Sequence, residues 1–266
     1  MTTAAGFLLA SKLHVPFALF AATLAGTALV IAAACVCNNY LDRKIDAKMA
    51  RTSKRASVTG AIPVQRGLVF AGLLGALGFA ILVRYTNAIV VTMGAVAVVS
   101  YVALYGIAKR RSVHGTLVGS IPGAAPIVAG YCAVTGRLDT GALLLFLVLA
   151  AWQMPHFYAI AMYRLKDYQA AGLPVWPAVK GIRSTKIQIV AYIAVFIAAS
   201  LLLTAYHYTG YIYAVLMLAV GAWWLRLAIR GFYAANDAKW AKKTFLFSLV
   251  VLMTLSVALP LGSVLP

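Results

Sequence analysis

Long apolar stretches separated by short polar segments run through the whole chain. Eight of them have the roughly 20 mostly apolar residues that a helix needs to cross a bilayer. They cover residues 13–41, 67–83, 85–108, 112–136, 141–163, 187–207, 209–225 and 244–265. A ninth stretch, residues 2–10, is half as long and lacks the basic region and cleavage site of a signal peptide. We predict an all-α, polytopic membrane helix bundle of nine helices in a single domain, 1–266, with residues 1–12 the remnant of a helix whose beginning is missing.

The composition agrees with a bilayer as the solvent. The chain of 266 residues is 64% hydrophobic and 11% charged, whereas a soluble domain carries about 25% charged residues. Its 23 Lys and Arg against 5 acidic residues, all Asp, give a net charge of +18. The long apolar runs favour a membrane protein with basic loops over a nucleic-acid-binding protein, so no nucleic-acid partner is expected. Cys35, Cys37 and Cys132 lie in apolar stretches without the spacing of a zinc site, which indicates packing residues.

Basic residues alternate between the connections in the way that membrane topology requires. Segments 43–66, 109–111, 164–186 and 226–243 hold 20 of the 23 Lys and Arg, and Lys12, Arg84 and Arg137 are the other three. Because basic loops stay on the cytoplasmic side, this alternation supports the helix count. It predicts a multi-pass protein of the cell inner membrane with cytoplasmic Asp-containing loops and the carboxyl terminus outside.

An acidic cluster lies at the end of the span 13–41. Asn38, Asp42 and Asp46 are four residues apart, so on a helix they share one face. The cations around them are Arg43, Lys44, Lys48, Arg51, Lys54 and Arg55. Mg²⁺ prefers one or two carboxylates together with phosphate oxygens and water, so this mixture suits a bound polyanion with Mg²⁺. The alternative is a solvated helix end in which the two Asp pair with neighbouring Lys and Arg, but ionisable groups at membrane depth are usually functional.

A second cluster, WQMPHFYAIAMYRLKDY at residues 152–168, follows an apolar span. Asp167 is a candidate third carboxylate for the same metal, with Arg164 and Lys166 beside it. We expect aromatic and His side chains to line a cavity between helices, namely Trp152, His156, Phe157, Tyr158 and Tyr163. Two alternatives stay open: aromatic residues are common at membrane interfaces, and His156 is either a haem-iron ligand or a hydrogen-bonded packing residue.

The segment between the clusters, residues 109–131, begins with Lys109, Arg110 and Arg111. These cations are candidates for binding the same polyanion, a diphosphate, as the acidic cluster, for determining the membrane topology, or for both. Glycines at 115, 119 and 123 allow the close approach of a neighbouring helix. Prolines at 122 and 126 are expected to bend the span and widen a pocket.

These stretches together resemble the haem-using branch of the intramembrane (UbiA-type) prenyltransferase superfamily. The N-x-x-x-D-x-x-x-D pattern at residues 38–46 indicates the superfamily, and segment 109–131 with WQMPHFY and KDYQAAGLP indicates the branch. The likeness runs from about Phe7 through RGFYAANDAKWAKK, residues 230–243. The second motif has one Asp where the superfamily often has two, a feature that the branch shares. The family's amino-terminal segment with Thr-Lys-Pro is absent.

The resemblance implies a nine-helix bundle around a lateral cavity and a Mg²⁺-dependent transfer of farnesyl from farnesyl diphosphate to the 2-vinyl group of haem b, giving haem O. The metal ligands would be Asn38, Asp42, Asp46 and Asp167. The catalytic residues would also include Arg51, Arg55, Lys109 and Lys166. The residues binding substrate would be Tyr105, Arg110, Trp152, His156, Tyr158, Arg164 and Tyr168. The expected partners are the lipid bilayer, both substrates, and haem A synthase or a terminal oxidase assembly.

Two other functions fit parts of the pattern. A prenyltransferase acting on an aromatic quinone precursor would keep the acidic motif without needing the haem-like stretch. A secondary transporter would also have many spans and intramembrane acids, but its sites usually lie near the bilayer midplane, often within repeated halves. Here the acids lie at the edge of the spans and no repeat is evident.

Overall fold

The computed structural model describes residues 1–266 and contains helices and short connections only. Eight segments are long and apolar enough to cross a membrane, which confirms the all-α membrane fold. They are α2 (Phe17–Leu41), α5 (Val64–Tyr85), the run of α6 (Ala88–Val99), η1 (Ser100–Tyr105) and α7 (Gly106–Arg111), α8 (Gly115–Thr135), α9 (Thr140–Tyr163), α12 (Ile182–Ala205), α13 (Tyr211–Arg230) with η2 (Gly231–Tyr233), and α14 (Asp237–Gly262). The chain is a multi-pass membrane protein.

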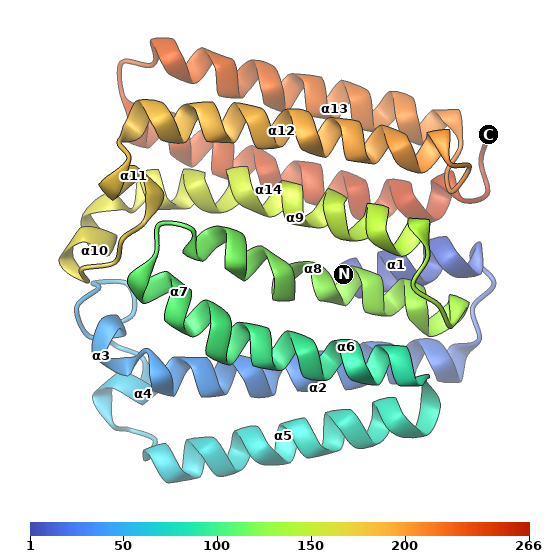
Figure 1. Ribbon diagram of the computed structural model, residues 1–266, viewed down its shortest axis with the longest axis horizontal. Helices are drawn as coiled ribbons and strands as arrows, with labels where there is room; N and C mark the ends of the chain where they lie inside the picture. Colours follow the sequence, from blue (N-terminus) through green and yellow to red (C-terminus); the bar gives the residue numbers. More distant parts are fainter.

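The other helices are short. They are α1 (Thr2–Ser11), α3 (Arg43–Asp46), α4 (Ala56–Thr59), α10 (Leu165–Ala170) and α11 (Trp176–Val179). Figure 1 shows the long helices side by side, with α3, α4, α10 and α11 together at one end of the bundle. We call this the loop-rich end, because the connections that follow α2, α7 and α9 all lie there.

Most predicted spans agree with the helices to within a few residues, and the last three differ most. Helix α12 begins at Ile182 rather than at residue 187. Helix α13 runs to Arg230 rather than ending at residue 225, and α14 begins at Asp237 rather than at residue 244. The Asn236 side chain caps α14 by accepting a hydrogen bond of 2.9 Å from the Lys239 amide. The predicted spans stopped at charged residues because they were defined by apolar residues alone. Long cationic side chains can keep their charge in water while the backbone stays helical, so the helices continue through these charged turns.

Helix α1 packs into the bundle despite its ten residues. It lies against α8 and α14, and its Phe7 is fully buried. Gly6 approaches the backbone of Ile127, and Gly130 approaches that of Thr3, so closely that a methyl group at either glycine would overlap the facing carbonyl oxygen. Small residues therefore set the distance between these helices.

The outer surface of the bundle is apolar. Large hydrophobic side chains on the outer helices, such as Leu73, Val83 and Val215, are more than half exposed. A soluble monomer rarely exposes apolar patches of this extent, whereas in a bilayer such residues face lipid. The buried core lies between α8, α9, α12, α13 and α14, where Leu145, Phe196 and Trp224 have no exposed surface.

Candidate functional site

The acidic motif lies where α2 ends. Helix α2 stops at Leu41, but Asp42 keeps right-handed helical dihedrals and leads directly into α3. Asn38, Asp42 and Asp46, which are four residues apart, therefore share one helical face across the junction. All three residues are buried, with 9%, 8% and 3% of their surface exposed. Buried carboxylates need charge partners, and the end of α7 and the connection before α4 supply them.

Lys109 and Arg110, at the end of α7, hold the first half of the motif. The Lys109 ammonium donates to Oδ1 of Asn38 at 2.7 Å and also to Oδ2 of Asp42. Arg110 donates to Oδ1 of Asp42 at 2.9 Å and to the backbone oxygen of Leu41 at 2.8 Å. Residues about 70 positions apart in the sequence thus meet, and two of the three cations of this segment, Lys109 and Arg110, lie on the acidic motif. Arg111 is exposed and forms no ion pair.

Arg55 holds the second half of the motif. Its guanidinium donates to Oδ2 of Asp46 at 2.7 Å and to Oδ1 of Asn39 at 3.1 Å. The loop between them is fastened by Thr52, whose hydroxyl donates to the Asp46 backbone oxygen at 2.9 Å. We call Asn38, Asp42, Asp46, Arg55, Lys109 and Arg110 the polar rim.

The second motif lies on α10, at the same end of the bundle as the first motif on α2 and α3 (Figure 1). Arg164 lies 3.9 Å from Asp167 in an ion pair, and Lys166 is exposed. Burial raises the pKa of the Tyr168 phenol above its usual value, and the Arg51 cation opposes that rise. A tyrosine phenol is already protonated at neutral pH, and the raised pKa of Tyr168 keeps it a hydrogen-bond donor there.

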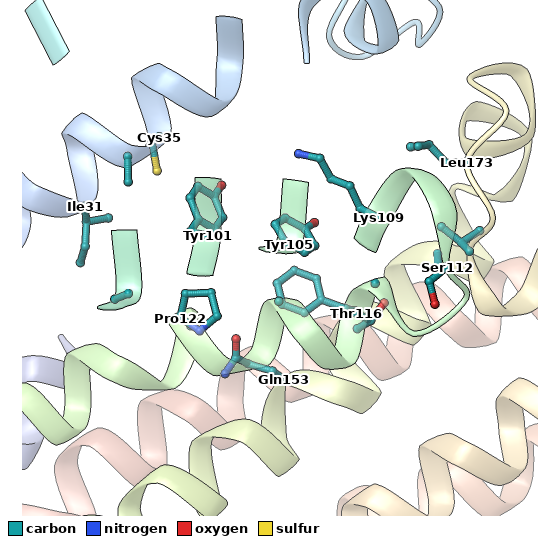
Figure 2. Close-up of a pocket in the computed structure, with 18 of the residues that line it drawn as sticks. Ile31, Cys35, Tyr101, Tyr105, Lys109, Ser112, Thr116, Pro122, Gln153 and Leu173 are labelled. Carbon is teal, nitrogen blue, oxygen red and sulfur yellow. The ribbon is translucent and has the colours of Figure 1, made fainter. Parts of the chain in front are cut away.

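A cavity of about 400 Å³ lies beside the polar rim, between α2, the run α6 to α7, α8 and α9. We call it the central cavity. Figure 2 shows Lys109 on one side and Gln153 on the other, with the rings of Tyr101 and Tyr105 between them. Most of the lining is apolar or small, and Pro122 and Pro126 both belong to it, as expected. The volume is in the range of small-molecule sites.

The irregular turn η1 shapes one wall of this cavity. Residues 100–105 form a π-helical turn, a feature that often marks functional sites. It stacks the Tyr101 and Tyr105 rings with centroids 5.6 Å apart. The Lys109 ammonium lies 4.9 Å from the centre of the Tyr105 ring, an attractive cation–π contact.

Helix α9 presents a different face to the cavity from the one we expected. Gln153, Phe157 and Ala161, four residues apart, line it. Trp152 and His156 instead pack on α14, where the indole donates to the Ser248 backbone oxygen at 2.8 Å and His156 Nδ1 lies 2.7 Å from the Ser248 hydroxyl.

The expectation that five aromatic and His side chains of this stretch line one cavity is therefore corrected: Phe157 does, whereas Trp152, His156, Tyr158 and Tyr163 do not. Tyr158 is 2% exposed, close to the rings of Trp176 and Tyr192. The reason is geometric, because neighbouring residues on a helix point about 100° apart and cannot all face one cavity. His156 is stacked on Trp152 with centroids 4.6 Å apart, so the structure places it as a hydrogen-bonded packing residue.

Sequence reasoning missed Tyr101 and Gln153 as lining residues. Each had a detectable signal in its spacing. Tyr101, Tyr105 and Lys109 are four residues apart, and so are Gln153, Phe157 and Ala161, which places each set along one helical face.

The donor chemistry of the polar rim fits Mg²⁺ with a diphosphate. No group of three or more His, Cys, Asp or Glu side chains is close enough to hold a metal ion by itself. Magnesium does not need one, since it prefers one or two carboxylates and takes its other oxygens from phosphate and water. The Lys109 ammonium between Asn38 and Asp42 shows that these two oxygens already converge on one cation.

The comparisons with known proteins identify the family of this chain. The model of the UbiA prenyltransferase family matches residues 1–250. The chain belongs to the UbiA prenyltransferase family. Among its curated relatives, a protoheme IX farnesyltransferase of Yersinia pseudotuberculosis serotype O:1b (strain IP 31758) is 51% identical over 253 residues, which are 95% of this chain and 86% of the relative.

Solved structures of UbiA proteins share the fold at low sequence identity. A structure of digeranylgeranylglyceryl phosphate synthase has a TM-score of 0.81 at 16% identity, covering 99% of this chain and 92% of that one. A UbiA homolog from Archaeoglobus fulgidus, bound to DMAPP and Mg²⁺, has a TM-score of 0.70 at 14% identity, covering 97% and 96%. Family membership makes this chain a prenyltransferase, and the solved structures show that it has the same fold.

Proposed function

We propose that this UbiA-family protein transfers farnesyl from farnesyl diphosphate to the 2-vinyl group of haem b and produces haem O. The observation that carries the proposal is the junction of a cation-rich rim with a largely apolar cavity. The rim suits a diphosphate, and the cavity suits a hydrocarbon chain. The identity of 51% to a protoheme IX farnesyltransferase supports haem as the acceptor.

Room for two large substrates comes from two adjoining hollows. The central cavity shares Ala97 and Pro122 with a second hollow of about 750 Å³, which includes Met93, Leu143 and Phe146. Its lining is mostly apolar, as a prenyl chain or a porphyrin face requires.

Asp42, Asp46 and Asn38 would hold the magnesium ion, with Asp167 contributing from the second motif. When bound, the ion neutralises part of the charge that builds on the diphosphate as the allylic C–O bond breaks. Lys109, Arg55 and Arg110 would turn toward the diphosphate from the carboxylates that they contact in the structure. Arg51 and Lys166 are further candidates for the same role.

Once they have turned to the bound diphosphate, the cations of the rim would stabilise the leaving group because their charges are in place before the C–O bond breaks. Preorganised cations at low dielectric stabilise developing charge more than water does, since they need no reorganisation during the reaction. The apolar lining keeps water away from the allylic cation until its C1 has bonded to the vinyl carbon. Water then adds to the resulting haem-side cation, which gives the hydroxyethylfarnesyl group.

We also propose that the polar rim faces the cytoplasm of a cell inner membrane. The four basic segments 43–66, 109–111, 164–186 and 226–243 lie at the loop-rich end (Figure 1) and carry 20 of the 23 Lys and Arg. Basic segments beside the spans are retained on the cytoplasmic side. The product would then pass to haem A synthase or a terminal oxidase assembly in the same membrane.

The test is haem extraction and mass analysis after membranes containing this chain are incubated with farnesyl diphosphate, haem b and Mg²⁺. We expect haem O and release of diphosphate. Parallel incubations replace haem b with aromatic acids. Prenylation of an aromatic acid without haem O would establish the quinone-precursor alternative, and ion flux without consumption of farnesyl diphosphate would establish a transporter.

A further inference from the structure

Gln153 places an amide group in the apolar part of the central cavity. It is 5% exposed and lies on the cavity wall near Pro122, Gly123 and Phe157. A buried amide is costly unless its polar atoms have partners. In the structure, only the amide nitrogen has hydrogen-bond partners.

The orientation of the amide is determined by its hydrogen bonds. Nε2 donates to the backbone oxygens of Ser120 and Leu149, both at 3.2 Å. A carbonyl oxygen only accepts, so the amide atom that faces these two oxygens must be the nitrogen. Oε1 therefore points the other way, toward the interior of the cavity in Figure 2, and no protein group donates to it.

Gly123 lets this oxygen take its place. A methyl group at Gly123 would overlap Oε1, so the absence of a side chain there is what admits the amide. The result is a rigid acceptor without a donor, held in a mostly apolar cavity next to the polar rim.

The proposed substrates offer this oxygen no donor. The farnesyl chain is a hydrocarbon, and the vinyl edge of haem b has only C–H bonds. The haem propionates are acceptors like Oε1 and would be repelled. Of the reactants, only water can donate to Oε1.

Gln153 lies deeper in the bundle than Lys109, and both residues line the central cavity. Gln153 lies ten residues before Tyr163, where α9 ends, which is about 15 Å along the helix. Lys109, by contrast, is two residues from the end of α7. The vinyl carbon that becomes cationic lies one bond beyond the carbon that joins farnesyl C1, so it is farther from the diphosphate than C1. Its water must be held deeper than the rim.

We propose that Oε1 of Gln153 positions the water that adds to the haem-side cation, an inference that rests on the proposed function. The C1–vinyl bond forms first as the C1–O bond to diphosphate breaks. The water oxygen then shares a lone pair with the cationic carbon and forms the new C–O bond. Its proton passes to the released diphosphate, because an amide oxygen is too weak a base to keep it. Gln153 orients the water and is not the proton acceptor.

The test separates prenyl transfer from hydration by mass. Without a positioned water, the haem-side cation loses a proton instead and gives a farnesylated alkene, lighter than haem O by one water. We expect Gln153→Met, similar in volume and without the acceptor, to raise the ratio of alkene to haem O at least tenfold. Gln153→Asn, which retracts the amide oxygen by one methylene, should raise the ratio less.

Two controls keep the readout specific. Phe157→Leu changes the same cavity wall one turn away and should slow transfer without changing the product ratio. With H₂¹⁸O, the parent chain should incorporate one labelled oxygen into haem O. The ratio is internal to each sample, so lower protein levels do not alter it.

An unchanged product ratio in Gln153→Met would overturn the inference. So would loss of all transfer in both Gln153 variants at normal membrane levels, since the positioned water is needed only after the prenyl bond has formed. A parent chain that makes no farnesylated haem refutes the proposed function itself, which is a distinct result.

Discussion

Replacing Lys109 by Met tests whether the polar rim acts on the diphosphate. In the structure the ammonium contacts Asn38 and Asp42 and also lines the central cavity. A hydrogen bond to a charged group is worth about 1.5–3 kcal/mol, and about 1.4 kcal/mol is tenfold in rate. Loss of one such contact to the leaving group should lower kcat/KM for farnesyl diphosphate about 10- to 160-fold.

For the same variant we also expect tighter use of Mg²⁺, although its rate is lower. Removing the ammonium frees Oδ1 of Asn38 and Oδ2 of Asp42, so the Mg²⁺ concentration for half-maximal activity should fall while the rate falls. The assay is diphosphate release from membranes over a Mg²⁺ titration, with haem O measured in parallel.

The matched control is Arg111→Met. Arg111 is in the same last turn of α7, is exposed and forms no ion pair. The substitution removes the same charge, so its kcat/KM should stay within about threefold of the parent, as expected for a screened surface charge. Equal losses in both variants would mean that overall charge, rather than the position of Lys109, determines the rate.

Three further predictions follow from the geometry. Asp42→Ala and Asp46→Ala should each abolish Mg²⁺-dependent product formation. The control Asp237→Ala breaks the 2.5 Å pair with Lys186, which lies outside the polar rim, and should still form product. Substantial turnover by either rim variant would contradict the assignment of these two Asp as metal ligands. His156→Gln should reduce the yield of folded protein but still form haem O, because the imidazole packs on Ser248; complete inactivity at normal protein levels would favour haem ligation instead. Gly130→Ala should destabilise the protein by about 1–3 kcal/mol, because the added methyl group would overlap Thr3. Gly72→Ala, with open space around it, should leave the stability unchanged. Thermal denaturation in detergent measures both, and equal stability of the two variants would show that this contact does not hold α1.

The sequence by itself determined the membrane class and the spans, because the bilayer requires long apolar helices and leaves little freedom in their length. The spacing of Asn38, Asp42 and Asp46 also predicted a shared face, since that relation is local to one helix. The resemblance in segments 38–46, 109–131 and 152–174 identified the family that the comparisons confirm.

Only the tertiary structure decided which cations meet the acids and which face of α9 meets the cavity. Lys109 rather than the nearer Lys44 or Lys48 contacts Asp42, because helix packing brings α7 beside the end of α2. The rotation of α9 sends His156 to α14 and Gln153 to the cavity. That rotation depends on contacts with Gly123 and Ser248, which are distant in sequence. A uniformly apolar span carries no periodicity that distinguishes a cavity-facing side from one that packs on another helix.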